Sequence, residues 1–150
     1  DVPVPGIIHN DFKFDNLVLN PDNPLEIIGV FDWEMATLGD PLMDLGSSLG
    51  YWVQADDTEE EKMIRMLPTV NDGMMTRREV VDYYLKKSGR QVDNFNFYYV
   101  FGSFRLAVIA QQIYYRFYHG QTKDERFGML IAAVEVLEKV ARRNIDHSEF

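Results

Sequence analysis

A dense turn signal between two apolar runs is the feature that most constrains the fold of this chain. The runs Leu17–Leu19 and Leu25–Phe31 are separated by Asn-Pro-Asp-Asn-Pro at residues 20–24. Two prolines within five residues prevent a helix from continuing through the segment. The pattern therefore predicts two short strands joined as a hairpin. Because the chain reverses between the strands, we expect Asn16 and Asp32 to lie at the same end of the hairpin.

Polar residues of a chemically useful kind surround this predicted hairpin. Four precede its first strand and two follow its second: His9, Asp11, Lys13, Asn16, Asp32 and Glu34. A rigid element can hold such side chains together at a surface.

The spacing His-x-Asp-x-Lys-x-x-Asn at residues 9–16 resembles the catalytic loop of kinases. Asp-Trp-Glu at residues 32–34 takes the place of their metal-binding Asp-Phe-Gly, and Thr-Leu-Gly-Asp-Pro-Leu follows at residues 37–42. Together these motifs are similar to those of the aminoglycoside phosphotransferase and choline kinase-like superfamily of small-molecule kinases. Residues 31–46 most resemble the branch that is fused to acyl-CoA dehydrogenases.

The resemblance implies a phosphotransferase that uses ATP and Mg²⁺ and acts on a small-molecule hydroxyl. Asp11 would orient or deprotonate that hydroxyl, and Lys13 would contact the transferred phosphate. Asn16 and Asp32 would bind the metal, which takes few protein ligands alongside phosphate and water oxygens. The branch points to a hydroxyacyl coenzyme A thioester as one candidate acceptor.

Other interpretations of these residues stay open. His9 is expected to be structural even within a kinase, Lys13 can be a solvated loop lysine, and Glu34 is either a third metal ligand or an exposed residue. Two other functions compete with the kinase. One is a non-catalytic, kinase-like binding or regulatory module, and the other is a metal-dependent hydrolase using His9, Asp11, Asp32 and Glu34.

The rest of the chain predicts helices. Asp40 and Pro41 have the N-cap and first-position preferences of a helix that runs to about Val53 and packs on the hairpin. The acidic residues 54–61 are expected to form a solvated connection or a helix start. A capping-box spacing, Thr76 with Glu79, begins a helix that ends near residue 88 before a C′ glycine.

Two longer helices are expected towards the end of the chain. Residues 95–118 predict a central buried helix, and residues 123–144 predict a helix that packs antiparallel against it. Aromatic residues of the first are expected to be core, although four tyrosines are candidates for an acceptor pocket: Tyr98, Tyr114, Tyr115 and Tyr118.

These elements predict an α+β class, and the resemblance implies that they form the mostly helical C-terminal lobe of a protein kinase-like fold. We expect a single domain over residues 1–150, with a catalytic and metal-binding hairpin at about 6–34 and a helical subdomain at about 40–145. The sequence contains neither a Gly-rich phosphate loop nor a Walker A motif. We therefore expect the N-terminal nucleotide-binding lobe to be missing, and the chain to be inactive alone.

Charge and composition limit the classes of partner that the chain can bind. The net charge is −9, from 24 acidic and 15 basic residues, and there is no basic stripe for nucleic acid. Cysteine is absent, which excludes disulfides and thiolate chemistry. No apolar run is long enough to cross a membrane. A cytoplasmic location is expected.

Overall fold

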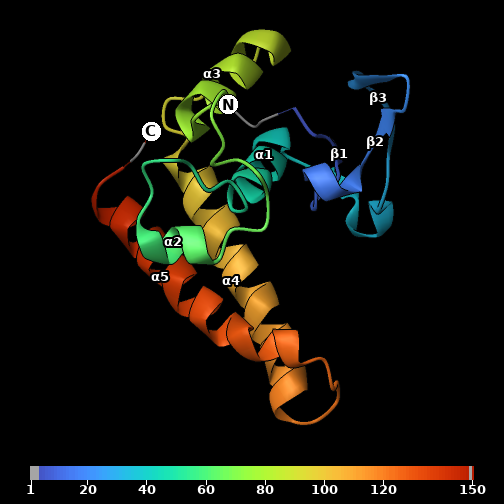
Figure 1. The fold of residues 1–150 in the computed structure, drawn as a ribbon. Helices are drawn as coiled ribbons and strands as arrows, with labels where there is room; N and C mark the ends of the chain where they lie inside the picture. Colours follow the sequence, from blue (N-terminus) through green and yellow to red (C-terminus); the bar gives the residue numbers. More distant parts are fainter. Residues whose placement is uncertain (1–3, 149) are drawn as a thin grey trace.

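A computed structural model describes residues 4–148 and 150, and Figure 1 shows its strands at one side of a group of helices. The strands are β1 Gly6–Ile8, β2 Leu17–Asn20, β3 Asn23–Val30 and β4 Thr37–Gly39. The helices are α1 Pro41–Leu49, α2 Glu59–Met63, α3 Arg77–Ser88, α4 Asn96–Tyr118 and α5 Leu130–Asp146. Three short 3₁₀ segments are η1 Phe14–Asn16, η2 Trp33–Met35 and η3 Glu125–Met129. The predicted α+β class is confirmed.

The predicted hairpin is also confirmed. Strands β2 and β3 are antiparallel, with Leu17 opposite Val30. Beyond this pair the Phe31 N–H donates to the Asn16 carbonyl at 2.8 Å, so Asn16 and Asp32 come to the same end of the hairpin. A second antiparallel pair, β1 with β4, was not predicted. Strands of three residues are too short to show a periodic pattern.

Helix α1 begins as predicted and packs differently. The Asp40 carboxylate accepts a hydrogen bond from the Leu42 N–H, and Pro41 is the first helical residue. The helix ends at Leu49, before the predicted Val53. Its packing on the hairpin was predicted wrongly, because α1 packs most extensively on α4. Gly46 and Gly102 face one another at this crossing, where a Cβ on either would meet the backbone of the other helix.

The core lies among the helices. Its buried members come from α1, α3, α4, α5 and the residue before α4: Leu42, Leu49, Val81, Phe95, Tyr99, Val136 and Val140. Helices α4 and α5 pack against one another along much of their length in an antiparallel pair, as predicted (Figure 1). Helix α5 begins at Leu130 instead of residue 123, because η3 precedes it. The centrally placed α4 is buried on one side only, since Phe97, Phe104 and Tyr118 are more than half exposed.

The acidic stretch is partly a helix start and is not simply solvated. Thr58 forms a capping box at the start of α2. Two acids beside it are buried in ion pairs: Asp57 lies 2.6 Å from Arg77, and Glu61 lies 2.8 Å from Arg143. Composition could not distinguish these acids from their exposed neighbours, because the basic partners come from α3 and α5.

Helix α3 follows the predicted boundaries. Thr76 and Glu79 form the capping box, and Gly89 ends the helix with a φ of 69°. Such a left-handed backbone favours glycine. Across residues 4–148 and 150, none of the helices has the length and apolar character needed to cross a membrane.

Candidate functional site

The loop that contains Asp11 is held by two helices. On α1, the Asp44 carboxylate accepts the His9 N–H at 2.7 Å and the Asn10 N–H at 2.8 Å. On α4, an Arg105 Nη1–H donates to the Asn10 carbonyl at 2.6 Å. Asn10 has a φ of 66°, a left-handed conformation that is costly for most residues. These three bonds hold the loop in that conformation.

His9 connects this loop to the end of β3. Its ring is 3% exposed, and its Nε2–H donates to the Phe31 carbonyl at 2.7 Å. Its Nδ1 accepts the Asp11 N–H at 3.2 Å, which fixes the tautomer. The Trp33 ring packs on the imidazole, with centroids 4.7 Å apart. Both ring nitrogens are therefore engaged with the protein, as the structural interpretation of His9 requires.

The Asp11 carboxylate receives three side-chain donors. Its Oδ2 accepts from Lys13 Nζ at 2.6 Å and from Asn16 Nδ2 at 3.2 Å. Its Oδ1 accepts from the Tyr51 hydroxyl at 3.1 Å. Burial, together with the negative charge of Asp11 and this hydrogen bond, raises the pKa of Tyr51 far above its usual value, so the hydroxyl stays protonated. Lys13 is thus an ion-paired residue and not a solvated one.

Asn16 and Asp32 fit a magnesium ion by their donor chemistry. The Asn16 amide nitrogen is committed to Asp11, which leaves its carbonyl oxygen as the ligand atom. Asp32 is exposed, has a φ of 64°, and makes no capping hydrogen bond with its side chain. Strained backbone of this kind is concentrated at functional sites. One amide oxygen and one carboxylate leave most of the octahedral positions of Mg²⁺ to phosphate and water oxygens.

The structure does not assemble the ligand set of a metal-dependent hydrolase. Glu34 is exposed on η2. Within the part of the chain that the structure describes, no three His, Asp or Glu side chains come together in a group that could hold a metal. His9 has no ring nitrogen available for one. This removes the main support for the hydrolase interpretation and gives none to Glu34 as a third ligand.

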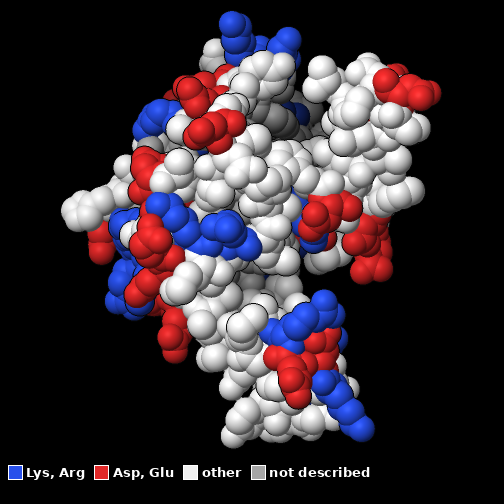
Figure 2. All heavy atoms as spheres, in the orientation of Figure 1, with Lys and Arg blue, Asp and Glu red and all other residues white. Residues whose placement is uncertain are grey.

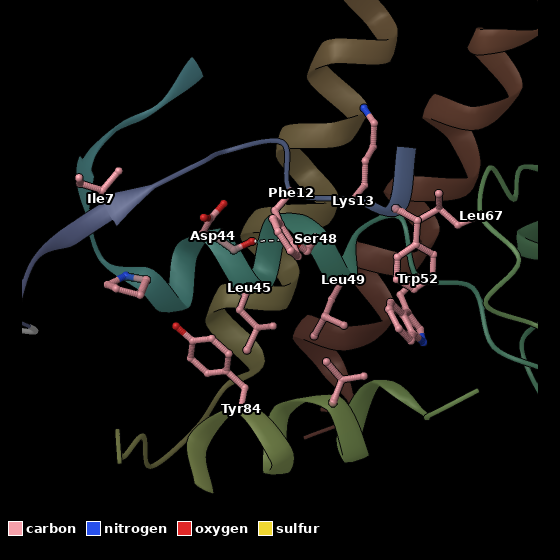
Figure 3. A pocket seen from close by; sticks show the side chains of 13 residues that line it. Ile7, Phe12, Lys13, Asp44, Leu45, Ser48, Leu49, Trp52, Leu67 and Tyr84 are labelled. Atoms are coloured by element: carbon pink, nitrogen blue, oxygen red, sulfur yellow. Dashed lines mark hydrogen bonds between the residues drawn. The ribbon is translucent and has the colours of Figure 1, made fainter. Parts of the chain in front are cut away.

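Two apolar cavities flank the Asp11 loop. One, of about 270 Å³, is lined at one side by Asp11, Lys13 and Tyr51 and elsewhere by apolar residues that include Leu106, Ile109, Ile113, Leu130 and Ala133. The other, of about 300 Å³, lies between the loop, α1 and α3. In Figure 3 Phe12 points towards α1 in this second cavity and Lys13 extends away from it. Asp11 lines the first cavity and not the second, so it can contact a ligand bound in the first.

The structure brings Asp11, Lys13 and Asn16 into direct contact. His9 accepts the backbone N–H of Asp11, and Asp32 lies at the adjoining end of the hairpin. Their catalytic and metal-binding roles remain predictions. Of the candidate pocket tyrosines, Tyr98 instead donates its hydroxyl to Asp40 at 2.9 Å, which anchors the start of α1.

Sequence reasoning missed three residues that position the site: Asp44, Tyr51 and Arg105. A weak signal was present for two of them. Asp44, Ser48 and Tyr51 follow one another at intervals of four and three residues in and just beyond an otherwise apolar helix, which places them on one face. No comparable spacing marks Arg105.

The chain is similar to known proteins in sequence and in fold. Residues 2–73 match the model of the phosphotransferase enzyme family. A solved structure from Ralstonia eutropha JMP134, assigned as an aminoglycoside phosphotransferase, superposes with a TM-score of 0.65 at 28% identity, covering 90% of this chain and 43% of that one.

Longer proteins also contain a related segment. Acyl-CoA dehydrogenase family member 10 of Mus musculus is 34% identical over 125 residues, which are 79% of this chain and 11% of that protein. Family member 11 of Homo sapiens is 31% identical over 124 residues, covering 80% and 15%. The chain thus spans less than a fifth of these relatives. The resemblance that its motifs indicated is confirmed: residues 2–73 carry the pattern of the phosphotransferase enzyme family, in a chain related to acyl-CoA dehydrogenase family members.

Proposed function

We propose that this chain supplies the catalytic and metal-binding loops of an ATP- and Mg²⁺-dependent phosphotransferase that acts on a small-molecule hydroxyl. The observation that carries the proposal is the Asp11 carboxylate, oriented by Lys13, Asn16 and Tyr51 at the wall of a cavity of about 270 Å³. Phosphoryl transfer depends mainly on such positioning and on charge neutralisation.

Each residue of the site has a separate role in the transfer. Asp11 holds the acceptor hydroxyl and takes its proton while the hydroxyl oxygen bonds to the γ-phosphorus and the bond from that phosphorus to the bridging oxygen of ADP breaks. Lys13 stabilises negative charge on the transferred group. Asn16 and Asp32 would hold Mg²⁺, which would neutralise negative charge on the phosphate groups during transfer.

The walls of the cavity favour an acceptor with an apolar part. Beyond Asp11 and Lys13 its lining is almost entirely aliphatic or aromatic, with no further carboxylate to attract a polycationic aminoglycoside. An acyl chain that carries a hydroxyl matches this surface. A hydroxyacyl coenzyme A thioester is the specific candidate, because the relatives named above are acyl-CoA dehydrogenase family members.

Binding of ATP beside these loops requires a further, nucleotide-binding lobe. The hairpin exposes Leu19, Leu25, Ile27 and Ile28, each by 47% or more, and Figure 2 shows a largely uncharged surface there. Exposed apolar strands are surfaces that other elements cover. We place a nucleotide-binding lobe, outside these 150 residues, against this face. Without that lobe the chain would be inactive, and we expect the protein to act in the cytoplasm.

The test uses the full-length protein that contains this chain. Transfer of ³²P from ATP to a panel of hydroxyacyl coenzyme A thioesters, choline and an aminoglycoside should require Mg²⁺ and one acceptor class. Asp11→Asn should lower kcat by at least about a hundredfold, the scale of lost general-base catalysis. Wild-type turnover by Asp11→Asn would refute the proposal, because Asp11 would then not be the base. Absence of transfer by the wild-type protein to every acceptor of the panel would instead favour a non-catalytic, kinase-like binding or regulatory module.

A further inference from the structure

We propose that Tyr51 is a positioning residue for the base: its hydroxyl fixes the Asp11 carboxylate so that Oδ1 faces the acceptor. This inference rests on the proposed function. It concerns a residue outside the catalytic motif, 40 positions along the chain from Asp11.

The two oxygens of Asp11 are occupied unequally. Oδ2 accepts from Lys13 at 2.6 Å and from Asn16 at 3.2 Å, which uses both of its lone pairs. Oδ1 accepts only the Tyr51 hydroxyl among the hydrogen bonds of the described residues. One lone pair of Oδ1 is therefore available to a second donor. The acceptor hydroxyl has to bind there if Asp11 is to take its proton.

Tyr51 is placed to define that position. It follows Gly50, the C-cap of α1, and its side chain lines the same cavity as Asp11 and Lys13. The Lys13 ammonium lies 5.1 Å from the centre of the Tyr51 ring, a cation–π distance. The ring is thus held from one side while its hydroxyl restrains Oδ1 from rotating about the Cβ–Cγ bond. That rotation moves both oxygens together, so the Tyr51 hydroxyl acts with the two Oδ2 contacts to fix the plane of the carboxylate.

Removal of the Tyr51 hydroxyl tests its positioning role without disturbing the fold. Tyr51→Phe keeps the ring and its contact with Lys13, so the variant is expected to fold. Loss of a hydrogen bond to a charged group predicts a fall in kcat of about tenfold. The KM values for ATP and for the acceptor should change by less than about twofold, because Tyr51 bonds the base and not the substrate.

A second variant tests the donor directly. Replacement of Tyr51 by 4-aminophenylalanine restores an N–H donor at nearly the same point and should recover at least half of the lost kcat. The matched control is Tyr98→Phe, which also removes a tyrosine hydroxyl that donates to a carboxylate, at the start of α1. Tyr98→Phe should leave kcat unchanged even where it lowers the melting temperature.

The assay uses the full-length protein, ATP, Mg²⁺ and a hydroxyacyl coenzyme A thioester, with Asp11→Asn measured beside the other variants. If Asp11→Asn abolishes transfer while Tyr51→Phe turns over at the wild-type rate, the inference about Tyr51 fails and the proposed function stands. A faster Tyr51→Phe variant would mean that the hydroxyl competes with the acceptor for Oδ1, which also overturns it. If Asp11→Asn retains transfer, both fail.

Discussion

Asp44 gives the sharpest test of how the catalytic loop is held. Its two carboxylate oxygens each accept one backbone N–H of the loop, from His9 and Asn10, and His9 is almost completely buried. Asp44→Asn keeps the shape of the side chain but turns one acceptor into a donor. One charge-assisted bond, worth about 1.5–3 kcal/mol, is then lost and two N–H groups face one another. We expect the free energy of unfolding to fall by about 2–4 kcal/mol.

Urea unfolding followed by tryptophan fluorescence measures this loss. One of the two tryptophans, Trp33, packs on the His9 ring and so reports on the loop itself. Asp82→Asn is the control, because Asp82 is exposed on α3 and its replacement should change stability by less than about 0.5 kcal/mol. If Asp44→Asn unfolds at the same urea concentration as Asp82→Asn, with an unchanged slope, the two bonds do not hold the loop and our account of the site is wrong.

Three further predictions concern buried polar groups. Asp57→Ala should lower the free energy of unfolding by about 3–5 kcal/mol, measured by urea titration, because it removes the carboxylate from the buried Arg77 guanidinium. Ser103→Ala should raise it by about 1 kcal/mol in the same measurement, because within the described residues the Ser103 hydroxyl is buried and has no hydrogen-bond partner. Burial acts to raise the pKa of Glu61, but hydrogen bonds from Arg143 and the capping threonine outweigh it and hold the pKa below its usual 4.5. The stabilisation by Glu61 is therefore complete above that pH and disappears as the pH falls through the folded-state pKa, so Glu61→Gln should flatten the acid side of a plot of stability against pH.

Elements that local chemistry determines could be predicted from the sequence. The hairpin follows from two prolines between apolar runs, and α3 follows from a capping box at one end and Gly89 at the other. The pairing of β1 with β4 joins residues 6–8 to residues 37–39 and leaves no local pattern. The exposed aromatic residues of α4 could not be predicted either. Composition gives the helix its apolar character, whereas the positions of α1 and α5 decide which of its faces are covered.

The same distinction applies within the site. The two motif donors to Asp11, Lys13 and Asn16, lie two and five positions away, so a local motif contains them. Tyr51 is 40 positions from Asp11, and Arg105 is 95 from the carbonyl to which it donates. A short motif contains the groups that take part in the chemistry, because one loop must present them together. The residues that fix the loop need not lie in that motif, since any element that the fold brings near the loop could supply them. The contacts of Tyr51 and Arg105 with the loop therefore had to come from the structure.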